Sequence, residues 1–380
     1  MRNERGAGET AQATHQGRAA QVTQDASRVS PVRQRLPTGR RGASRGLLIG
    51  VDIGGTNQTV AAARETGEAL SIRRRRLQPG GAAADVLANV LAMIDEALAE
   101  AAPSAQDGAA AGGGRSAARR LLRVGVGFGG PVDAERGLVL RSHHVRGWDR
   151  FPLKQELERR LGVPVVLDND ANAAALGEAL FGAGRGERHV LYVNIGTGIG
   201  GGLVLNGALF QGAHGLAGEI GHVTVDPDGP PCDCGKQGCL EAVASGRSVA
   251  RRAREAAARD PARAARLVAL AGGEVQAIDS PHVFAAAREG DGLAQALVRQ
   301  TGDYVGLALA GAANLLDPSI VIIGGGLAET GDLLFDPVRD AFRRHLLPAL
   351  PAAPVVPAAL GYDAGVIGAL ALALSGRGEQ

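Results

Sequence analysis

Four glycine-rich segments, each following a stretch of apolar residues, constrain the fold of this chain most strongly. They lie at residues 52–57, 125–131, 196–202 and 324–326. Glycine has no Cβ, so a glycine turn at the end of a strand lets backbone N–H groups approach a bound phosphate. One such turn is ordinary in an α/β protein. Four of them, two of which carry a threonine, favour a phosphate-binding fold.

Two common phosphate-binding motifs do not fit these segments. A Walker A loop needs Gly-Lys followed by Ser or Thr, but the two lysines, Lys154 and Lys236, each precede glutamine. A dinucleotide fingerprint matches formally at residues 125–130 and 196–201, yet that fingerprint must open a helix. The second match is followed instead by a hairpin signal at Asn206-Gly207.

Between the glycine segments the apolar pattern is that of an α/β chain. Strands are predicted at residues 47–53, 58–63, 121–126, 163–167, 189–195 and 319–323. Helices are predicted at residues 84–100, 171–181 and 364–374, and helix dominates residues 249–316. A strand, glycine turn and second strand at 47–63, repeated at 189–210, predict two ribonuclease H-like (actin-like) domains with phosphates held between two hairpin turns.

Residues 1–45 differ from the rest of the chain in charge. They hold nine arginines and three acidic residues, which leaves 32 basic and 36 acidic residues in 46–380. Without apolar periodicity, 1–45 is expected to form a disordered basic tail, with a transit peptide as the alternative. The mildly acidic remainder gives no electrostatic reason for nucleic-acid binding. No apolar run reaches the ~18 residues of a membrane span, so we expect a cytoplasmic protein without a membrane partner.

The three cysteines are crowded together and indicate a metal site, since an odd number does not suit a disulfide framework. With one histidine they supply the ligands of a closed structural zinc site: His222, Cys232, Cys234 and Cys239. The alternative is that the cysteines are small buried hydrophobic residues. A tight spacing on a loop rich in glycine and proline favours structural Zn²⁺ bound by the loop at 222–239.

Two glutamates lie close to this loop in the sequence, Glu219 and Glu241. If one nitrogen of His222 binds metal, the other is a fixed N–H donor. Each sugar hydroxyl both donates and accepts a hydrogen bond. Fixed carboxylates beside an N–H donor therefore suit a polyhydroxylated ligand, whereas the alternative for each glutamate is a solvated surface charge.

Carboxylates and amides concentrate at residues 168–172, which read Asp-Asn-Asp-Ala-Asn between a predicted strand and helix. A single Asp or Asn would serve as the helix N-cap. A carboxylate at the carboxyl end of a strand is well placed as a general base, so we favour that role for Asp170 over capping. Asp52 ends the first strand beside a glycine turn, where a carboxylate organises Mg²⁺ through its waters.

Taken in order, these motifs resemble the ROK family, which comprises bacterial sugar kinases and sugar-responsive repressors. The matching motifs are Asp52-x-Gly-Gly-Thr56, the Gly-Pro-Val-Asp that ends at Asp133, Asn169-Asp170-Ala-Asn172, Gly196-Thr-Gly-Ile-Gly200, Gly218-Glu-Ile-Gly-His222 and Cys232-x-Cys-Gly-x-x-Gly-Cys239-x-Glu241. The resemblance covers residues 46 to about 375. It implies a two-lobed, hexokinase-type, actin-like ATPase fold, with the sugar between the lobes and the terminal helix packed on the N-terminal lobe.

We accordingly place a small lobe at residues 46–165 together with a C-terminal helix at 360–380, and a large lobe at 166–359. The resemblance implies that Asp170 takes the proton from a sugar hydroxyl. It implies sugar contacts from Gly130, Asn169, Asp170, Glu219, His222 and Glu241. It implies ATP contacts from Asp52, Gly54, Gly55, Thr56, Asn57, Thr197, Gly198, Gly324, Gly325 and Gly326.

These expectations describe an ATP- and Mg²⁺-dependent hexose kinase, acting first of all on the 6-hydroxyl of glucose, as a homodimer or homotetramer. One loop departs from the family pattern. Glucokinase-like members usually carry Pro-Asn before a Gly-Trp, whereas residues 141–148 read Arg-Ser-His-His-Val-Arg-Gly-Trp. Because the loop borders the sugar, mannose, fructose and N-acetylated amino sugars stay open.

The alternative is a sugar-sensing regulator or binding protein without turnover. ROK repressors carry a winged helix-turn-helix before this domain, and residues 1–45 have neither the length nor the apolar pattern for one. Asp170 and the phosphate turns are all present, although a pure sensor would not need them. The sequence therefore favours the enzyme.

Overall fold

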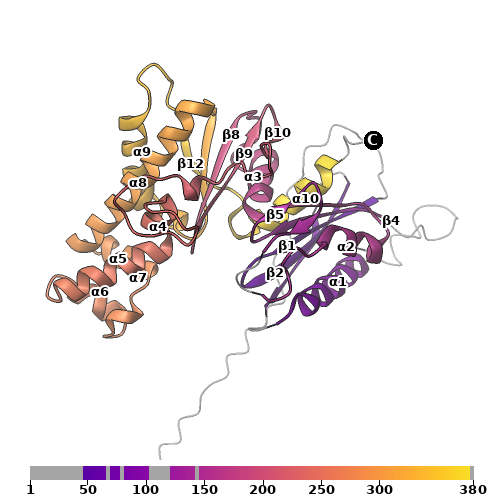
Figure 1. Ribbon diagram of the computed structural model, residues 1–380, viewed down its shortest axis with the longest axis horizontal. Coiled ribbons are helices and arrows are strands. Elements are labelled where there is room, and N and C mark those ends of the chain that lie inside the picture. The colour runs from indigo at the N-terminus through magenta and orange to yellow at the C-terminus, as the bar shows by residue number, and fades with distance from the viewer. Residues whose placement is uncertain (1–45, 66–68, 78–80, 102–119, 142–144, 377–380) are drawn as a thin grey trace, which may run out of the picture. The chain divides into compact units, whose positions relative to one another are not determined.

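The computed structural model describes residues 46–65, 69–77, 81–101, 120–141 and 145–376. The expected tail at 1–45 lies outside these residues. The described strands form two five-stranded sheets with the same plan, in the orders β3-β2-β1-β4-β7 and β10-β9-β8-β11-β12, and one short two-stranded ladder. Each large sheet joins three antiparallel strands to two strands that pair in parallel (Figure 1).

The first sheet is built from β1 (Gly46–Ile53), β2 (Asn57–Arg64), β3 (Ala69–Arg76), β4 (Arg120–Phe128) and β7 (Val165–Asn169). Its central strands are apolar because helices and core side chains cover them. The predicted helix is confirmed as α1 (Ala83–Glu100), whose buried side is apolar and includes Val86, Val90 and Met93. Near this sheet lie α2 (Leu153–Leu161) and the ladder of β5 (Val132–Asp133) and β6 (Leu138–Val139). Since β7 pairs with β4, this sheet extends four residues beyond the expected lobe boundary at 165.

The second sheet is built from β8 (Val190–Ile195), β9 (Ile199–Leu205), β10 (Ala208–Leu209), β11 (Ile320–Gly324) and β12 (Val355–Pro357). The predicted hairpin is confirmed, because Ala208 pairs with Leu205 across a turn in which Asn206 and Gly207 both have positive φ. Such values are typical of the tight turns that join adjacent antiparallel strands.

The helical region predicted at 249–316 is also confirmed. It contains α5 (Gly246–Arg259), α6 (Ala265–Leu270), α7 (Ser280–Arg288) and α8 (Gly292–Leu316), and it is flanked by α4 (Leu240–Ala244) and α9 (Asp332–His345). Short 3-10 turns lie at Ile220–His222, Val275–Ala277, Ala328–Thr330 and Gly361–Asp363. Among the described residues, no helix is both long and apolar enough to span a membrane.

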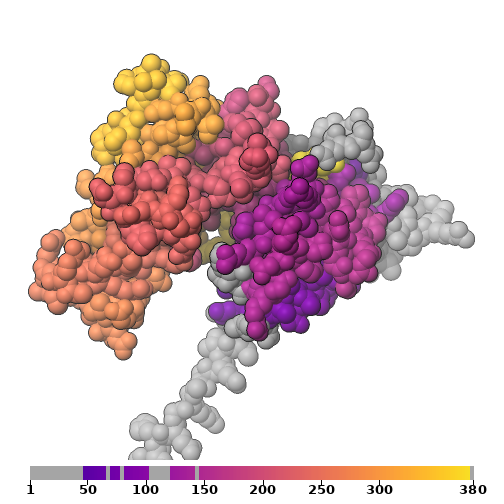
Figure 2. All heavy atoms as spheres, viewed as in Figure 1, coloured from indigo at the N-terminus to yellow at the C-terminus, as the bar shows by residue number. Residues whose placement is uncertain are grey.

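Two apolar helices, α3 (Asp170–Phe181) and α10 (Ala364–Ser375), pack against each other. The C-terminal α10 returns to the first sheet, where glycines let its backbone approach the strands. A Cβ on Gly50 would lie 2.7 Å from Val366 O, and one on Gly125 would lie 1.9 Å from Ala369 O. On the face drawn in Figure 2 little of the yellow α10 is visible, in agreement with its burial.

Candidate active site

The two hairpin turns at the ends of β1 and β8 are closed by backbone hydrogen bonds. Gly54 N–H donates to Asn57 O at 3.0 Å, and Gly196 N–H donates to Gly198 O at 2.9 Å. The side chains of Thr56 and Thr197 are exposed, so both hydroxyls are free to meet a ligand. The strand, turn and strand arrangement predicted at 47–63 and 189–210 is therefore confirmed.

In two of the four glycine segments, several of the glycines lie within strands and not in turns. Gly125 and Gly127 lie inside β4, and Gly200, Gly201 and Gly202 lie inside β9. A Cβ on Gly202 would lie 2.6 Å from Cβ of Ala175 in α3. These glycines therefore allow helices to approach a sheet, and the interpretation of the whole segments as strand-ending turns is wrong for them.

The four polar side chains at residues 168–172 have different roles. Asn169 Oδ1 accepts hydrogen bonds from the N–H groups of the first turn of α3, so Asn169 is the N-cap. Its Nδ2 donates to Gly130 O at 3.1 Å. Asp168 is buried and accepts from Asn172 Nδ2 at 2.9 Å and from Gln211 Nε2 at 2.6 Å. Asn169 therefore caps the helix and Asp168 is a buried hydrogen-bond acceptor. Asp170 has neither of these roles.

Asp170 lines a cavity of about 370 Å³. Of the sequence-predicted residues, the cavity brings together Asp52, Asp170, Gly324, Gly325 and Gly326. It also exposes residues that the sequence does not single out, namely Asn194 on β8 and Tyr362, whose side chain is 82% exposed. No sequence motif indicates Tyr362, because only the tertiary structure brings it to the same cavity as the glycine turn at 324–326.

Gly129 shows how closely Asp170 lies to the first turn. A Cβ on Gly129 would come 3.3 Å from Asp170 Oδ2 and 3.3 Å from Gly54 Cα. No side chain fits between the carboxylate and the turn without displacing one of them. Gly129 is therefore a site residue that the sequence analysis did not identify, beyond its place in a glycine segment.

Two carboxylates in the cavity, those of Asp52 and Asp170, are perturbed by their surroundings. The pKa of Asp170 is raised to about 6, mainly by burial. The Glu219 carboxylate also raises this pKa, and several hydrogen bonds oppose the shift. Burial also raises the pKa of Asp52 to about 7, with a smaller contribution from Asp170 and an opposing one from Arg74. Paired acids with pKa values near neutrality are characteristic of catalytic sites.

The four predicted metal ligands form one cluster, with ligand atoms within 4.8 Å of one another. Cys234 Sγ lies 3.6 Å from Cys239 Sγ, and Cys232 Sγ lies 3.7 Å from His222 Nδ1. Two thiolates on a tetrahedral zinc with ~2.3 Å bonds are about 3.8 Å apart. The donor set and its spacing therefore fit zinc. His222 Nδ1 faces the cysteines, while Nε2 lies 3.9 Å from Glu219 Oε2.

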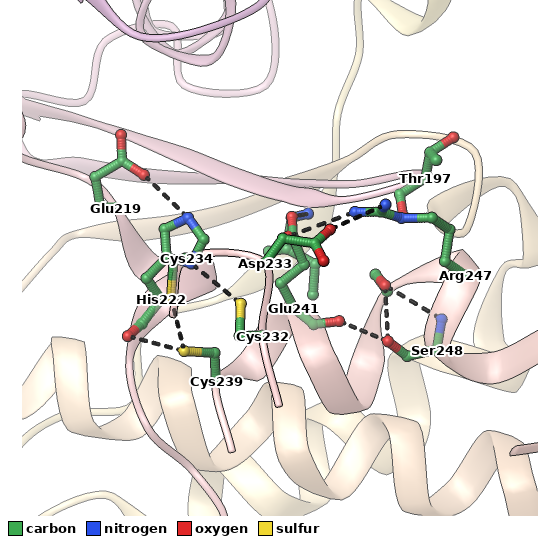
Figure 3. A network of polar contacts seen from close by, with 12 residues as sticks. Thr197, Glu219, His222, Cys232, Asp233, Cys234, Cys239, Glu241, Arg247 and Ser248 are labelled. Atoms are coloured by element: carbon green, nitrogen blue, oxygen red, sulfur yellow. Dashed lines mark hydrogen bonds and ion pairs between the residues drawn. The ribbon is translucent and has the colours of Figure 1, made fainter. Parts of the chain in front are cut away.

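Glu241 and Arg247 join the Cys₃His cluster to the hairpin turn at residues 196–198, as Figure 3 shows. Glu241 Oε2 accepts the N–H of Ile199 at 2.8 Å. Arg247 Nε donates to Thr197 O at 3.2 Å, and Arg247 Nη1 contacts Asp233 Oδ2 at 3.2 Å. Arg247 Nη2 lies 3.7 Å from Glu241 Oε1. The Glu241 carboxylate is thus engaged by the turn, and Arg247 is a further site residue that no sequence motif indicates.

Two sheets of one plan, each with a strand, hairpin turn and strand, contribute residues to one cavity that two perturbed carboxylates line. This arrangement defines an actin-like ATPase fold of the hexokinase type. The Cys₃His cluster on an adjoining loop is a feature that distinguishes this chain within the class of actin-like ATPase folds. The chain matches the ROK family model over residues 48–375. It therefore belongs to the ROK family.

Relatives within the family include enzymes and regulators. The chain is 40% identical to a glucokinase of Streptomyces coelicolor, over 86% of this chain and 98% of that protein. A crystal structure of a ROK glucokinase of Streptomyces griseus with glucose and AMPPNP matches with a TM-score of 0.70 and 41% identity, over 87% of this chain and 100% of that chain. A putative xylose repressor of a Caldicellulosiruptor species is 31% identical over 87% of this chain and 78% of the repressor.

Proposed function

We propose that glucose is the sugar that this ATP-dependent hexose kinase phosphorylates, with Asp170 as the general base for the 6-hydroxyl. The observation that carries the proposal is the position of the Asp170 carboxylate. It lines a cavity together with Asp52 and the glycine turn at 324–326, and it lies beside the turn that begins at Gly54. Identity of 40% to a glucokinase over nearly its full length supports glucose as the substrate.

The sugar is proposed to bind on the side of Asp170 that faces Glu219. The Glu219 carboxylate is one of the charges that raise the pKa of Asp170, and a sugar bound between the two groups would contact both. His222 Nε2, 3.9 Å from Glu219 Oε2, would donate to the same sugar. Gly130, Asn169 and Glu241 complete the proposed sugar contacts. Alternating donors and acceptors suit vicinal hydroxyls.

ATP is proposed to lie along the opposite side of the cavity. Its phosphates would meet the turns at 54–57 and 196–198, and its adenosine would lie near Gly324, Gly325 and Gly326. Asp52 would hold Mg²⁺ through water, and Mg²⁺ supplies neutralisation of the phosphate charge. We propose structural zinc at His222, Cys232, Cys234 and Cys239, where four protein ligands leave no open position.

Asp170 contributes only part of the rate in this proposal. A positioned base provides roughly 10²–10⁴-fold. Alignment of the hydroxyl with the phosphoryl group and neutralisation of phosphate charge provide most of the remainder. Asp170 with a pKa of about 6 is a stronger base than an ordinary aspartate and is still ionised at neutral pH.

Asp170→Asn tests the base directly. The variant keeps the shape of the side chain but cannot accept the proton, so kcat is expected to fall by at least 10²-fold while calorimetry still detects glucose binding. Asp168→Asn is not a suitable control, because Asp168 is a buried hydrogen-bond acceptor. Asp332→Asn, exposed on α9, is the matched control and should keep wild-type turnover. Turnover retained by Asp170→Asn would contradict the assignment.

A coupled assay of ADP release with glucose, mannose, fructose, N-acetylmannosamine and N-acetylglucosamine tests the substrate. Glucose is expected to give the highest kcat/KM. A regulator without turnover is the alternative, supported by the xylose repressor relative, and it predicts sugar binding without ADP release for every sugar. We further propose a homodimer or homotetramer, which light scattering of the purified chain would measure.

A further inference from the structure

A second cavity, of about 330 Å³, shares no lining residue with the one that holds Asp170. Its walls come from the loop at 222–239 and from α4, α5 and α8. One part of the lining is apolar and consists of Val243, Leu293 and Leu297. The rest carries charge, which distinguishes this cavity from an ordinary packing gap.

The charges in this cavity are not balanced. Three arginines, Arg251, Arg252 and Arg259, face two carboxylates, Asp226 and Glu255. The formal charge of the lining is +1, since only Glu255 forms an ion pair and the partner of Asp226 is a neutral hydroxyl. Arg251 Nη1 forms an ion pair with Glu255 Oε1 at 2.8 Å, and the hydroxyl of Tyr304 donates to Asp226 Oδ2 at 3.1 Å. Two guanidinium groups, those of Arg252 and Arg259, are left facing the cavity.

Arg252 is the unusual member of this group. Its Nη1 donates to Gln300 Oε1 at 2.6 Å, and its Nη2 donates to Thr301 Oγ1, so both partners are neutral. Its Nε is buried and has no hydrogen-bond partner among the described residues. Burial lowers the pKa of this guanidinium to about 10. A buried charge with neutral partners only is costly, and an anion placed against it removes that cost.

We propose that this cavity binds a small phosphate monoester, whose dianion pairs with Arg252 and Arg259. The guanidinium groups of Arg252 and Arg259 form no ion pair among the described residues, and the planar fork of arginine suits the oxygens of a phosphate group. The apolar wall would cover the organic part of the ligand. A volume of about 330 Å³ is at the lower end of that of small-molecule sites.

The cavity is connected to the proposed sugar site through shared elements. Its residues Asp226 and Pro230 belong to the zinc loop, where Gly238 N–H donates to Pro230 O at 2.9 Å. Arg251 Nη2 donates to Ala242 O at 3.1 Å, next to Glu241 in α4. Occupancy is therefore expected to change the dissociation constant of glucose, and coupling between two sites is typically fivefold or more. The coupling to glucose rests on the proposed function, whereas the binding of a phosphate monoester to the second cavity does not.

The proposal is tested by calorimetry on the zinc-loaded full chain, with glucose and a non-hydrolysable ATP analogue filling the active site. Glucose 6-phosphate is expected to bind with one equivalent and more tightly than inorganic phosphate. Arg252→Gln should weaken that binding by about tenfold or more, because it removes a charge-assisted contact. Arg299→Gln, an exposed change of the same charge on α8 outside the cavity, should leave it unchanged.

Several outcomes would overturn the proposal. They are the absence of binding to the wild-type chain, binding that Arg252→Gln does not alter, and inorganic phosphate binding as tightly as the ester. If Arg252→Gln fails to fold, the exposed Arg259→Gln should still weaken binding several-fold, and an unaltered affinity would count against the site. The alternative occupant is a carboxylate of a second copy of the chain. In that case the wild-type chain would not bind the phosphate ester and Arg252→Gln would lose self-association, a result that also overturns the proposal. An unchanged glucose dissociation constant overturns the coupling alone.

Discussion

At the scale of single residues, four similar side chains acquire different roles from their surroundings. Asn169 caps α3, Asp168 accepts two buried side-chain hydrogen bonds, and Asn172 supplies one of them. Asp170 is left beside the cavity with a raised pKa. The sequence indicates that this cluster holds more acids and amides than one helix cap requires. It does not assign the roles, because these depend on Gln211 and Gly130, which lie about 40 residues away on either side.

The raised pKa of Asp170 predicts the pH dependence of catalysis. A general base acts in its ionised form, so kcat/KM should rise with pH through a midpoint near 6 and then level off. Glu219→Gln removes a negative charge that raises this pKa, so the midpoint should move to lower pH. Profiles of kcat/KM in buffers of constant ionic strength measure it. Glu329→Gln, in the same cavity but not a cause of the shift, should keep the wild-type midpoint. A midpoint for Glu219→Gln at or above that of the wild type would contradict the electrostatic explanation.

At the scale of elements, the apolar strands and the long helices follow from the sequence pattern, whereas several elements do not, among them β3 and α9. The sequence pattern does not predict β3, because it ends in four arginines, nor α9, because it contains Pro337 and alternating charges. Tertiary contacts provide the reason. Arg73 and Arg75 of β3 form ion pairs with Glu96 of α1. Cross-element partners of this kind override local propensity.

The first turn of α10 is fitted to Asp52. A Cβ on Gly365 would lie 2.6 Å from Asp52 Oδ2. Replacing a helical glycine by alanine usually stabilises by up to about 1 kcal/mol, but Gly365→Ala would displace a carboxylate proposed to organise Mg²⁺. We expect kcat to fall at least tenfold and the Mg²⁺ requirement to rise, with glucose binding retained in calorimetry.

Gly311→Ala is the matched control for this change. Gly311 lies in α8, is exposed, and a Cβ there would meet no other atom within 4 Å among the residues described. This variant should keep full activity and gain a few degrees in Tm. If Gly365→Ala behaves in the same way as Gly311→Ala, the fit between α10 and Asp52 has no functional consequence.

At the scale of the whole molecule, residues of both sheets line one cavity. Asp52 comes from β1 of the first sheet, whereas Asn194 and Gly324 come from β8 and β11 of the second. The loop of the proposed zinc site lies on a different part of the chain and reaches the hairpin turn at residues 196–198 through Glu241 and Arg247. Damage to the zinc loop should therefore affect sugar affinity and the stability of the loop together.

Cys234→Ser tests this coupling. The variant removes one of four ligands, and a structural zinc site contributes on the order of 10 kcal/mol to the folding of its loop. Zinc content measured by atomic absorption should fall below stoichiometry, Tm should fall, and the KM for glucose should rise at least tenfold. Asp233→Asn changes the exposed neighbouring residue and should retain zinc. Full zinc content in Cys234→Ser would remove the zinc assignment.

The sequence by itself determined the α/β class, the two strand, turn and strand units, the metal-ligand set and the family, because all of these depend on short spacings along the chain. Only the tertiary structure decided which glycines form turns and which admit a helix. Only the tertiary structure decided that Asn169 is the cap while Asp170 lines the cavity, and that Arg252 is a partly buried charge whose hydrogen-bond partners among the described residues are neutral. These properties arise from groups brought together from distant parts of the chain, and burial and charge at a site are sums over all such neighbours.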